Sequence, residues 1–285
     1  LKEVNLSIRS LLEGSSLSKI PAFSVSNIDE TGISELLSFL NDAASNICSR
    51  KIDGNFRLAV DRYFTLKGTG CIVTGSVHSG RVNVGDELSV FPSEKIVRVR
   101  AIHTQNTNSE TGKLGERCAL NLVASKAVLS GIKRGDWILH RKAVNSSYRI
   151  DATLRVSRNE KNGLMHWMPA HLHFGAGDIM CRVAVLEGHK IDPGQKGFVQ
   201  MVLDKPICAV FGDKFILRDI SARRVVAGGK IINIFAKAKG RTQEHRIETL
   251  RVMANEKPSV CLKNLLRISS CGVDLVSFCK LRNLT

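Results

Sequence analysis

Three charged residues lie in two short motifs whose side chains could bind an anion. Asp61 and Arg62 end the run FRLAVDR (56–62), and Arg117 lies in GERCALN (115–121). A guanidinium stays protonated, so Arg62 and Arg117 could each form charge-assisted hydrogen bonds with an anion. We expect Asp61 to orient Arg62. Spacing alone favours a plainer interpretation, a surface Asp–Arg pair and an arginine at a strand edge, since exposed ion pairs are frequent and weak.

A second basic group is predicted near a late turn. Arg218, Arg223 and Arg224 lie in DKFILRDISARRVVAGGKIINI (213–234). Arginines placed like this could neutralise backbone phosphates of a nucleic acid, which positions a ligand without reading its sequence, or could contact another domain. The alternative for each of them is a solvated basic turn.

The histidines and cysteines give little sign of a metal site. His171 and His173 are two apart on a predicted strand and therefore share a face, and Cys181 could be a third ligand. No second ligand pair has suitable spacing. We therefore predict no metal site, and we assign no catalytic residue.

The motifs of a nucleotide-hydrolysing site are absent from the sequence. There is no GxxxxGK[ST] loop, no DxxG and no NKxD, and Lys67-Gly68-Thr69 lacks the first glycine of a phosphate loop. We do not expect this chain by itself to hydrolyse GTP.

The composition of the chain narrows the classes of molecule that it is expected to bind. The 285 residues carry a formal charge of +16, and the excess of Lys and Arg lies in the middle and at the end of the chain. Such a surface favours a polyanion, most simply a nucleic acid, over a merely basic protein. The eight cysteines form no CxxC pair and are expected to be reduced thiols. No run of 18 apolar residues occurs, so no membrane span is predicted.

Residues 1–50 differ from the rest in pattern. A helical stripe at Val4, Ile8, Leu11 and Leu12 should end at Gly14, IPAFSV (20–25) should form a short buried strand, and Thr31-Gly32 should open a second helix. A helix, a strand and a helix cannot close a core. We therefore expect this segment to be the last piece of a larger α/β domain.

From residue 51 the period-two pattern with glycine bends predicts a mainly β protein of two consecutive antiparallel barrels, at 51–142 and 147–236. Gly75 and Gly80 should form a corner, and Val82–Phe91 should form one strand. The further expected strands are 97–104, 116–123, 135–140, 149–156, 170–175, 179–187, 197–204, 214–219 and 229–235. A basic linker (236–246) should lead into two or three short helices, with a winged-helix-like unit over 243–285.

Taken together, these segments resemble the translational GTPases, and most of all the selenocysteine-specific elongation factors. The resemblance rests on FRLAVDR, GERCALN, residues 213–234 and the helical tail. It implies a remnant of the GTPase domain (1–50), barrel domains II and III, and the start of a winged-helix domain. It also places Ser26 where a backbone N–H meets guanine, and Asp61, Arg62 and Arg117 in the aminoacyl pocket.

The resemblance further implies the partners. Selenocysteyl-tRNA and the ribosome are expected, with Arg218, Arg223 and Arg224 facing tRNA or another domain. The mRNA hairpin should bind only through C-terminal domains not included here. GTP and Mg²⁺ should serve the intact protein, a cytoplasmic monomer, but should not bind this chain alone. The alternatives are a general translation GTPase and an OB-like nucleic-acid-binding barrel, and the few aromatic residues disfavour the latter.

Overall fold

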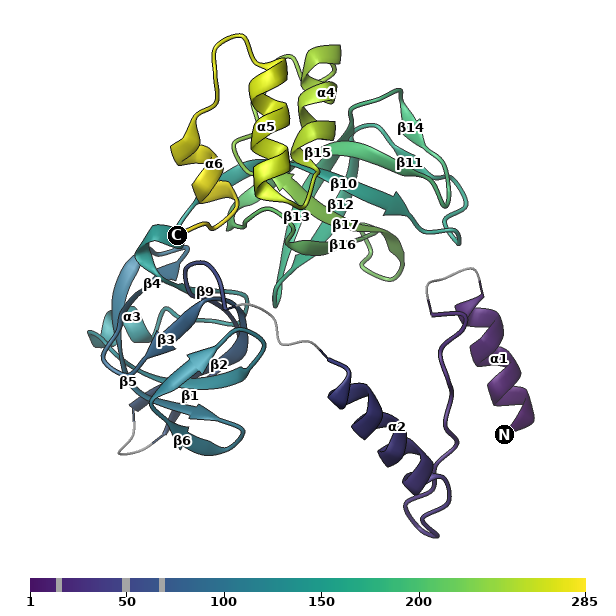
Figure 1. Cartoon of the computed structure of the whole chain (residues 1–285), viewed down its shortest axis with the longest axis vertical. Coiled ribbons are helices and arrows are strands. Elements are labelled where there is room, and N and C mark those ends of the chain that lie inside the picture. The colour runs from purple at the N-terminus through teal and green to yellow at the C-terminus, as the bar shows by residue number, and fades with distance from the viewer. Residues whose placement is uncertain (14–16, 48–51, 67–69) are drawn as a thin grey trace. The chain divides into compact units, whose positions relative to one another are not determined.

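Most of the chain folds into two closed antiparallel β-barrels followed by three helices (Figure 1). The structure, a computed structural model, describes residues 1–13, 17–47, 52–66 and 70–285. It divides into two units, Leu1–Lys51 and Ile52–Thr285, and both barrels belong to the second unit. The prediction of a mainly β fold with two consecutive barrels is confirmed.

The first barrel closes through six strands in the order β4-β9-β1-β2-β8-β5, and a pairing of β4 with β5 completes the ring. Alternate residues such as Leu58, Val60 and Val73 are buried inside it, as the pleat of a strand requires. The strands of this region, with one short helix, are β1 (Arg57–Leu66), β2 (Gly70–Ser79), β3 (Arg81–Asn83), β4 (Glu87–Phe91), β5 (Lys95–Thr104), β6 (Thr107–Ser109), β7 (Thr111–Lys113), β8 (Arg117–Val123), α3 (Lys126–Leu129) and β9 (Trp137–Leu139).

The second barrel closes in the order β10-β15-β13-β12-β16-β17. Ile150, Leu172 and Leu217 are fully buried in its interior. A 3₁₀ turn, η1 (Arg141–Ala143), connects the two barrels. The strands are β10 (Ser146–Val156), β11 (Leu164–Met165), β12 (Met168–Phe174), β13 (Gly177–Val185), β14 (Lys190–Ile191), β15 (Lys196–Cys208), β16 (Lys214–Arg218) and β17 (Val225–Asn233).

The two barrels share an apolar seam. Trp137 of the first barrel stacks on Phe174 of the second, with ring centroids 5.2 Å apart. Gly175 has a φ of +58°, and a Cβ there would lie 2.7 Å from the Trp137 ring. Glycine is therefore required at this position both by the backbone conformation and by the approach of the indole. The seam fixes one barrel against the other.

Three helices follow the second barrel: α4 (Glu244–Met253), α5 (Pro258–Ile268) and α6 (Leu275–Leu281). α4 and α5 lie side by side (Figure 1). Ile247 and Leu250 of α4 pack on Leu186 and Ile232 of the barrel, and Arg246 binds the fully buried Asp151 with an N–O distance of 2.7 Å. Within the described residues, no helix is long and apolar enough to cross a membrane.

The first unit contains the two expected helices, α1 (Lys2–Leu12) and α2 (Ile33–Ser45). The strand predicted over residues 20–25 is wrong, because these residues are in no strand. No described segment pairs with them, and Phe23 instead packs on Phe39 of α2, with ring centroids 5.1 Å apart. Gly14, predicted to end the first helix, lies outside the described residues.

Two details of the first barrel also differ from the sequence prediction. The segment predicted as one strand, Val82–Phe91, forms two, because the chain turns at Gly85 with a φ of +93°. β3 then pairs with β7, whereas β4 pairs with β5 and β9. Gly75 is not at a corner but inside β2, opposite a bulge in β1.

Candidate functional site

A bulge in β1 brings the acidic member of the FRLAVDR motif to the outer face of the first barrel. Val60 pairs with Gly75 and Arg62 pairs with Thr74, so Asp61 is the extra residue. A Cβ on Gly75 would lie 2.0 Å from the Ala59 carbonyl oxygen. The missing side chain allows β1 and β2 to come this close beside the bulge.

Asp61 holds Arg117 of β8, and the two residues form a bidentate ion pair. Arg117 Nη1 donates to Asp61 Oδ2, and Nη2 donates to Oδ1 at 2.9 Å. Thr74 completes the cluster, since its hydroxyl donates to Asp61 Oδ1 at 2.8 Å and accepts from Arg117 Nη2 at 3.2 Å. The planar guanidinium is therefore fixed in one orientation.

The expected pairing of Asp61 with Arg62 is wrong. Arg62 is exposed, and it forms no ion pair or side-chain hydrogen bond with any described residue. It lies opposite Thr74 across the strand pair, and directly paired residues share a face of the sheet. Arg62 and Arg117 are thus neighbours of the same threonine, but only Arg117 has a counterion.

The electrostatics of this cluster follow from that pairing. The hydrogen bonds from Arg117 lower the pKa of Asp61, although partial burial opposes the shift. The same bonds raise the pKa of Arg117. The pair is close to neutral as a unit, and Arg62, whose charge also lowers the pKa of Asp61, adds a positive charge beside it.

A cavity of about 310 Å³ opens beside Arg117. Two of its wall residues, Gln105 and Asn106, form the left-handed turn between β5 and β6. The complete lining is Thr74, His103, Gln105, Asn106, Gly115, Glu116, Arg117, Cys118 and Ala119. An anionic group that entered here would meet the N–H groups of Arg117 that Asp61 and Thr74 do not occupy.

The basic turn of the second barrel is organised by an acidic residue that the sequence did not single out. Asp219 Oδ1 accepts the backbone N–H groups of Arg223 and Arg224, each at 2.8 Å. The bond from the Arg224 N–H is the largest cause of the strongly lowered pKa of Asp219. The Arg224 side chain pairs with Glu160 at 3.1 Å, whereas Arg223 is exposed without a side-chain partner among the described residues.

Arg218 lies at the end of β16, opposite His171 of β12. His171 Nδ1 is 2.9 Å from Asp178 Oδ1, and its Nε2 is 3.2 Å from the Ile220 carbonyl oxygen. His171 therefore links the sheet to the basic turn. In the described part of the chain, no group of three or more His, Cys, Asp and Glu residues is arranged to hold a metal ion.

Ser26, the predicted guanine contact, lies in the turn before α2. Its backbone N–H donates to the Thr31 carbonyl oxygen at 3.0 Å, and its hydroxyl accepts from the Ile28 N–H at 3.4 Å. The group expected to meet guanine is thus engaged within the turn.

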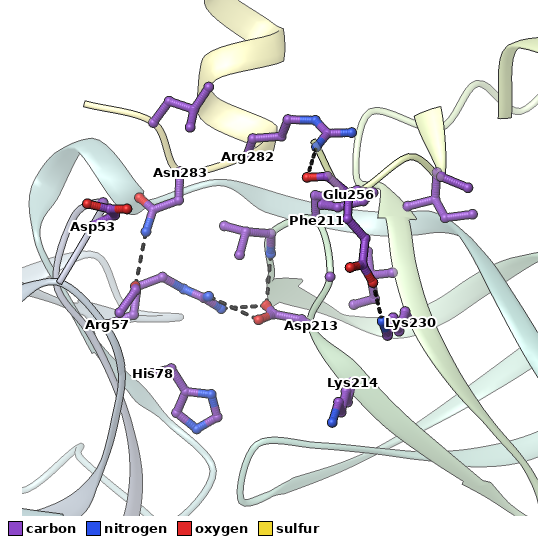
Figure 2. Close-up of a pocket in the computed structure, with 18 of the residues that line it drawn as sticks. Asp53, Arg57, His78, Phe211, Asp213, Lys214, Lys230, Glu256, Arg282 and Asn283 are labelled. Atoms are coloured by element: carbon purple, nitrogen blue, oxygen red, sulfur yellow. Dashed lines mark hydrogen bonds and ion pairs between the residues drawn. The ribbon is translucent and has the colours of Figure 1, made fainter. Parts of the chain in front are cut away.

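Sequence reasoning missed an ion pair at the junction of the two barrels and the helical tail (Figure 2). Arg57 of β1 binds Asp213, which precedes β16, through two bonds of 3.1 and 2.6 Å. Asp213 also accepts the Val210 N–H at 2.9 Å, and the Arg57 guanidinium lies 4.8 Å from the Trp137 ring centroid. The signal available was an arginine directly before the three apolar residues Leu58, Ala59 and Val60 at the start of β1.

The C-terminal end of the tail reaches the same junction. The Asn283 amide nitrogen donates to the Asn55 carbonyl oxygen and the Ser79 hydroxyl, each at 3.0 Å, and its oxygen accepts the Asn55 N–H at 3.1 Å. Arg282 donates to the carbonyl oxygens of residues 253 and 255 and covers the Phe211 ring at 3.9 Å. The tail therefore bonds to the first barrel and packs on the second.

Comparison with known proteins identifies similar sequences over most of the chain. A family model described as the β-barrel domain of the selenocysteine-specific elongation factor matches residues 151–238. The selenocysteine-specific elongation factor of Desulfomicrobium baculatum is 30% identical over 272 residues, which is 95% of this chain and 42% of that protein. The Haemophilus influenzae factor is 35% identical over 225 residues, 78% of this chain and 35% of that protein.

Solved structures agree in fold. A bacterial selenocysteine-specific elongation factor aligns with a TM-score of 0.76 at 21% identity, covering 100% of this chain and 45% of that chain. The Methanococcus maripaludis factor in complex with a GTP analogue aligns with a TM-score of 0.70 at 21% identity, covering 82% and 55%. The chain spans less than half the length of the curated relatives named above.

Proposed function

Because the chain belongs to the family of selenocysteine-specific elongation factors, we propose that its barrels hold the aminoacyl end of selenocysteyl-tRNA. The parent protein would deliver this tRNA to the ribosome at a recoded UGA codon. The observation that carries the proposal is the fixed Arg117 guanidinium on the outer face of the first barrel, beside a cavity and the unpaired Arg62.

The roles in the aminoacyl pocket follow from the charges. A selenol is more acidic than a thiol or an alcohol, so selenocysteine is anionic near neutral pH, where serine is neutral. Arg62 supplies a positive charge that favours the selenolate. Arg117 supplies oriented N–H donors, and Asp61 and Thr74 are positioning residues that hold Arg117.

The second barrel contributes contacts to the tRNA backbone. Arg223 is the most open of the three candidate arginines, since Arg224 pairs with Glu160 and Arg218 is half-buried. Such phosphate contacts would position the tRNA, and they make its binding fall as salt rises.

GTP and Mg²⁺ belong to the intact protein in this proposal, as does the contribution of Ser26 to the guanine site. This chain would not bind them alone, and the mRNA hairpin would bind through domains outside it. The intact factor would act as a monomer in the cytoplasm.

The test is competition binding of selenocysteyl-tRNA and seryl-tRNA, with the chain alone and after a GTP-binding domain is restored upstream. We expect a preference for selenocysteyl-tRNA that Arg62→Ala and Arg117→Ala each reduce by about tenfold. Arg100→Ala, an exposed arginine on β5, is the matched control and should leave the preference intact. Equal affinities for the two tRNAs, unchanged in both pocket variants, would exclude this assignment.

A further inference from the structure

A second cavity, of about 440 Å³, lies where the two barrels and the helical tail meet (Figure 2). Its walls include Asp53 and His78 from the first barrel, Lys214 and Lys230 from the second, and Glu256 from the tail. This volume falls within the range of small-molecule sites, about 300–1,000 Å³. No residue of the proposed aminoacyl pocket lines it.

Among the charged side chains that line this cavity, four form two ion pairs, whereas Asp53, Lys214 and Arg282 have no ion pair with a described residue. Asp213 is bound by Arg57, and Glu256 is bound by Lys230 at 2.7 Å. In the part of the chain that the structure describes, neither the Lys214 ammonium nor the His78 ring has a hydrogen bond or an ion pair. Together with the buried Nε–H groups of Arg57 and Arg282, which also have no partner among the described residues, these two groups can donate to a ligand in the cavity.

The placement of Lys214 carries an electrostatic cost. It lies directly opposite Lys230 in the pairing of β16 with β17, and like charges in that arrangement repel. Glu256 compensates only Lys230. Figure 2 shows Lys214 and His78 on opposite sides of the same end of the cavity, one from each barrel. An anion between them would relieve the repulsion and would be bound from both sides.

We propose that this cavity binds a small phosphate-bearing ligand, with the phosphate between Lys214 and His78. Phosphate suits the site because a lysine ammonium and an imidazole N–H can each donate to its oxygens. Val210, Phe211 and Ile231 add apolar wall to the remaining volume, so an organic group attached to the phosphate also fits. Since each donor belongs to a different barrel, the ligand bridges the two.

His78 makes this site sensitive to pH. It faces Arg57 of β1, Asp213 before β16 and Lys214 of β16, and its ring meets the edge of Trp137 at 4.9 Å. Burial first, and then Arg57, lower the pKa of His78, while Asp213 raises it. The lowered pKa favours the neutral ring, which keeps one N–H that can donate to a phosphate oxygen. Because a phosphate also takes up its second proton near pH 6, the pH dependence of binding reflects the ligand and His78 together.

The experiment is titration calorimetry of the chain with inorganic pyrophosphate and with adenosine 5′-monophosphate, at constant ionic strength in chloride. We expect saturable binding of at least one of them at pH 7.5. Lys214→Gln should weaken it about tenfold, and His78→Gln should weaken it as well. Lys196→Gln, an exposed lysine on β15, is the control and should bind as the unchanged protein does.

A third arm uses a short RNA oligonucleotide to separate free phosphate from RNA-borne phosphate. If pyrophosphate or the mononucleotide binds and its binding depends on Lys214 and His78, the ligand of this cavity is a small phosphate-bearing molecule. Binding of the RNA alone, with the same dependence, assigns the phosphate to a nucleic acid and overturns the small-ligand proposal. Thermal melts of each variant verify folding. No saturable binding, or binding unchanged in folded Lys214→Gln and His78→Gln, also overturns it.

Discussion

Two arginine–aspartate pairs of the same bidentate type occupy opposite environments in this protein. The side chains of Arg57 and Asp213 are 1% and 11% exposed at the junction of the barrels. The side chains of Arg117 and Asp61 are 53% and 29% exposed on the outer face of the first barrel. One pair connects two barrels across 156 residues of sequence, and the other connects two strands of one barrel.

The difference in burial gives the two pairs different roles. Removing one member of a buried pair leaves an uncompensated charge away from water, which costs far more than the pair contributes over an apolar substitute. An exposed pair contributes little to the stability of the fold, because water already solvates both charges. Arg57 therefore maintains the arrangement of the barrels, whereas Arg117 is free to serve a ligand at little cost to folding.

The largest effect is expected for Arg57→Ala. It leaves Asp213 buried without its counterion and should lower the free energy of unfolding by about 3–5 kcal/mol. Denaturant unfolding measures the loss. A loss of unfolding free energy below about 1 kcal/mol would show that water solvates this junction, and the two pairs would then not differ in their contribution to stability.

An intermediate effect is expected for Arg57→Lys. The ammonium keeps the charge but replaces the bidentate fork and its contact with the Trp137 ring. We expect a loss of roughly 2 kcal/mol in the same unfolding experiment. Full retention of stability would mean that the positive charge at position 57 is sufficient to stabilise the junction, without the two-pronged geometry of the guanidinium.

A small effect is expected for Arg117→Ala, at most about 1 kcal/mol of unfolding free energy. Added salt should diminish it further, since an exposed pair is screened. The effect of Arg57→Ala should persist at the same salt concentrations. A loss from Arg117→Ala as large as that from Arg57→Ala would contradict the assignment of a ligand-facing role.

The smallest effect on stability is expected for Asp61→Asn, and it depends on pH. Because Arg117 lowers the pKa of Asp61 in the folded protein, the carboxylate stabilises the fold above the pKa of the unfolded carboxyl, about 3.9. This contribution is lost as the pH falls through the lower folded value. The difference in stability between the protein and Asp61→Asn should therefore shrink below about pH 4. A difference that grows on acidification would mean that Asp61 is protonated in the fold.

The sequence predicted the barrels well because glycine bends and alternation are local signals. It failed where partners are distant in sequence. Asp61 was assigned to Arg62, its neighbour, because nothing local shows the bulge that turns Asp61 toward Arg117 on β8. Gly75 was the available clue, since a glycine inside a strand often marks a bulge.

The same limitation explains the other differences. Arg57 stands at the start of a strand that carries other polar residues as well, and its partner Asp213 comes from the other barrel. IPAFSV has the composition of a buried strand, but a strand forms only with a neighbour to pair with, and the described residues provide none. Val82–Phe91 alternates well enough for one strand, yet Gly85 divides it between two sheets.

The contact of Asn283 with Asn55 and Ser79 has a consequence for the order of folding. It joins Asn283 to residues 228 and 204 positions earlier in the sequence, so it requires the tail and the first barrel to have come together. The entropic cost of closing so large a loop rises only slowly with its length. A contact between such distant residues is nevertheless a poor starting point for folding. Because Asn283 is synthesised after both barrels, any folding of the first barrel on the ribosome before that point proceeds without this contact.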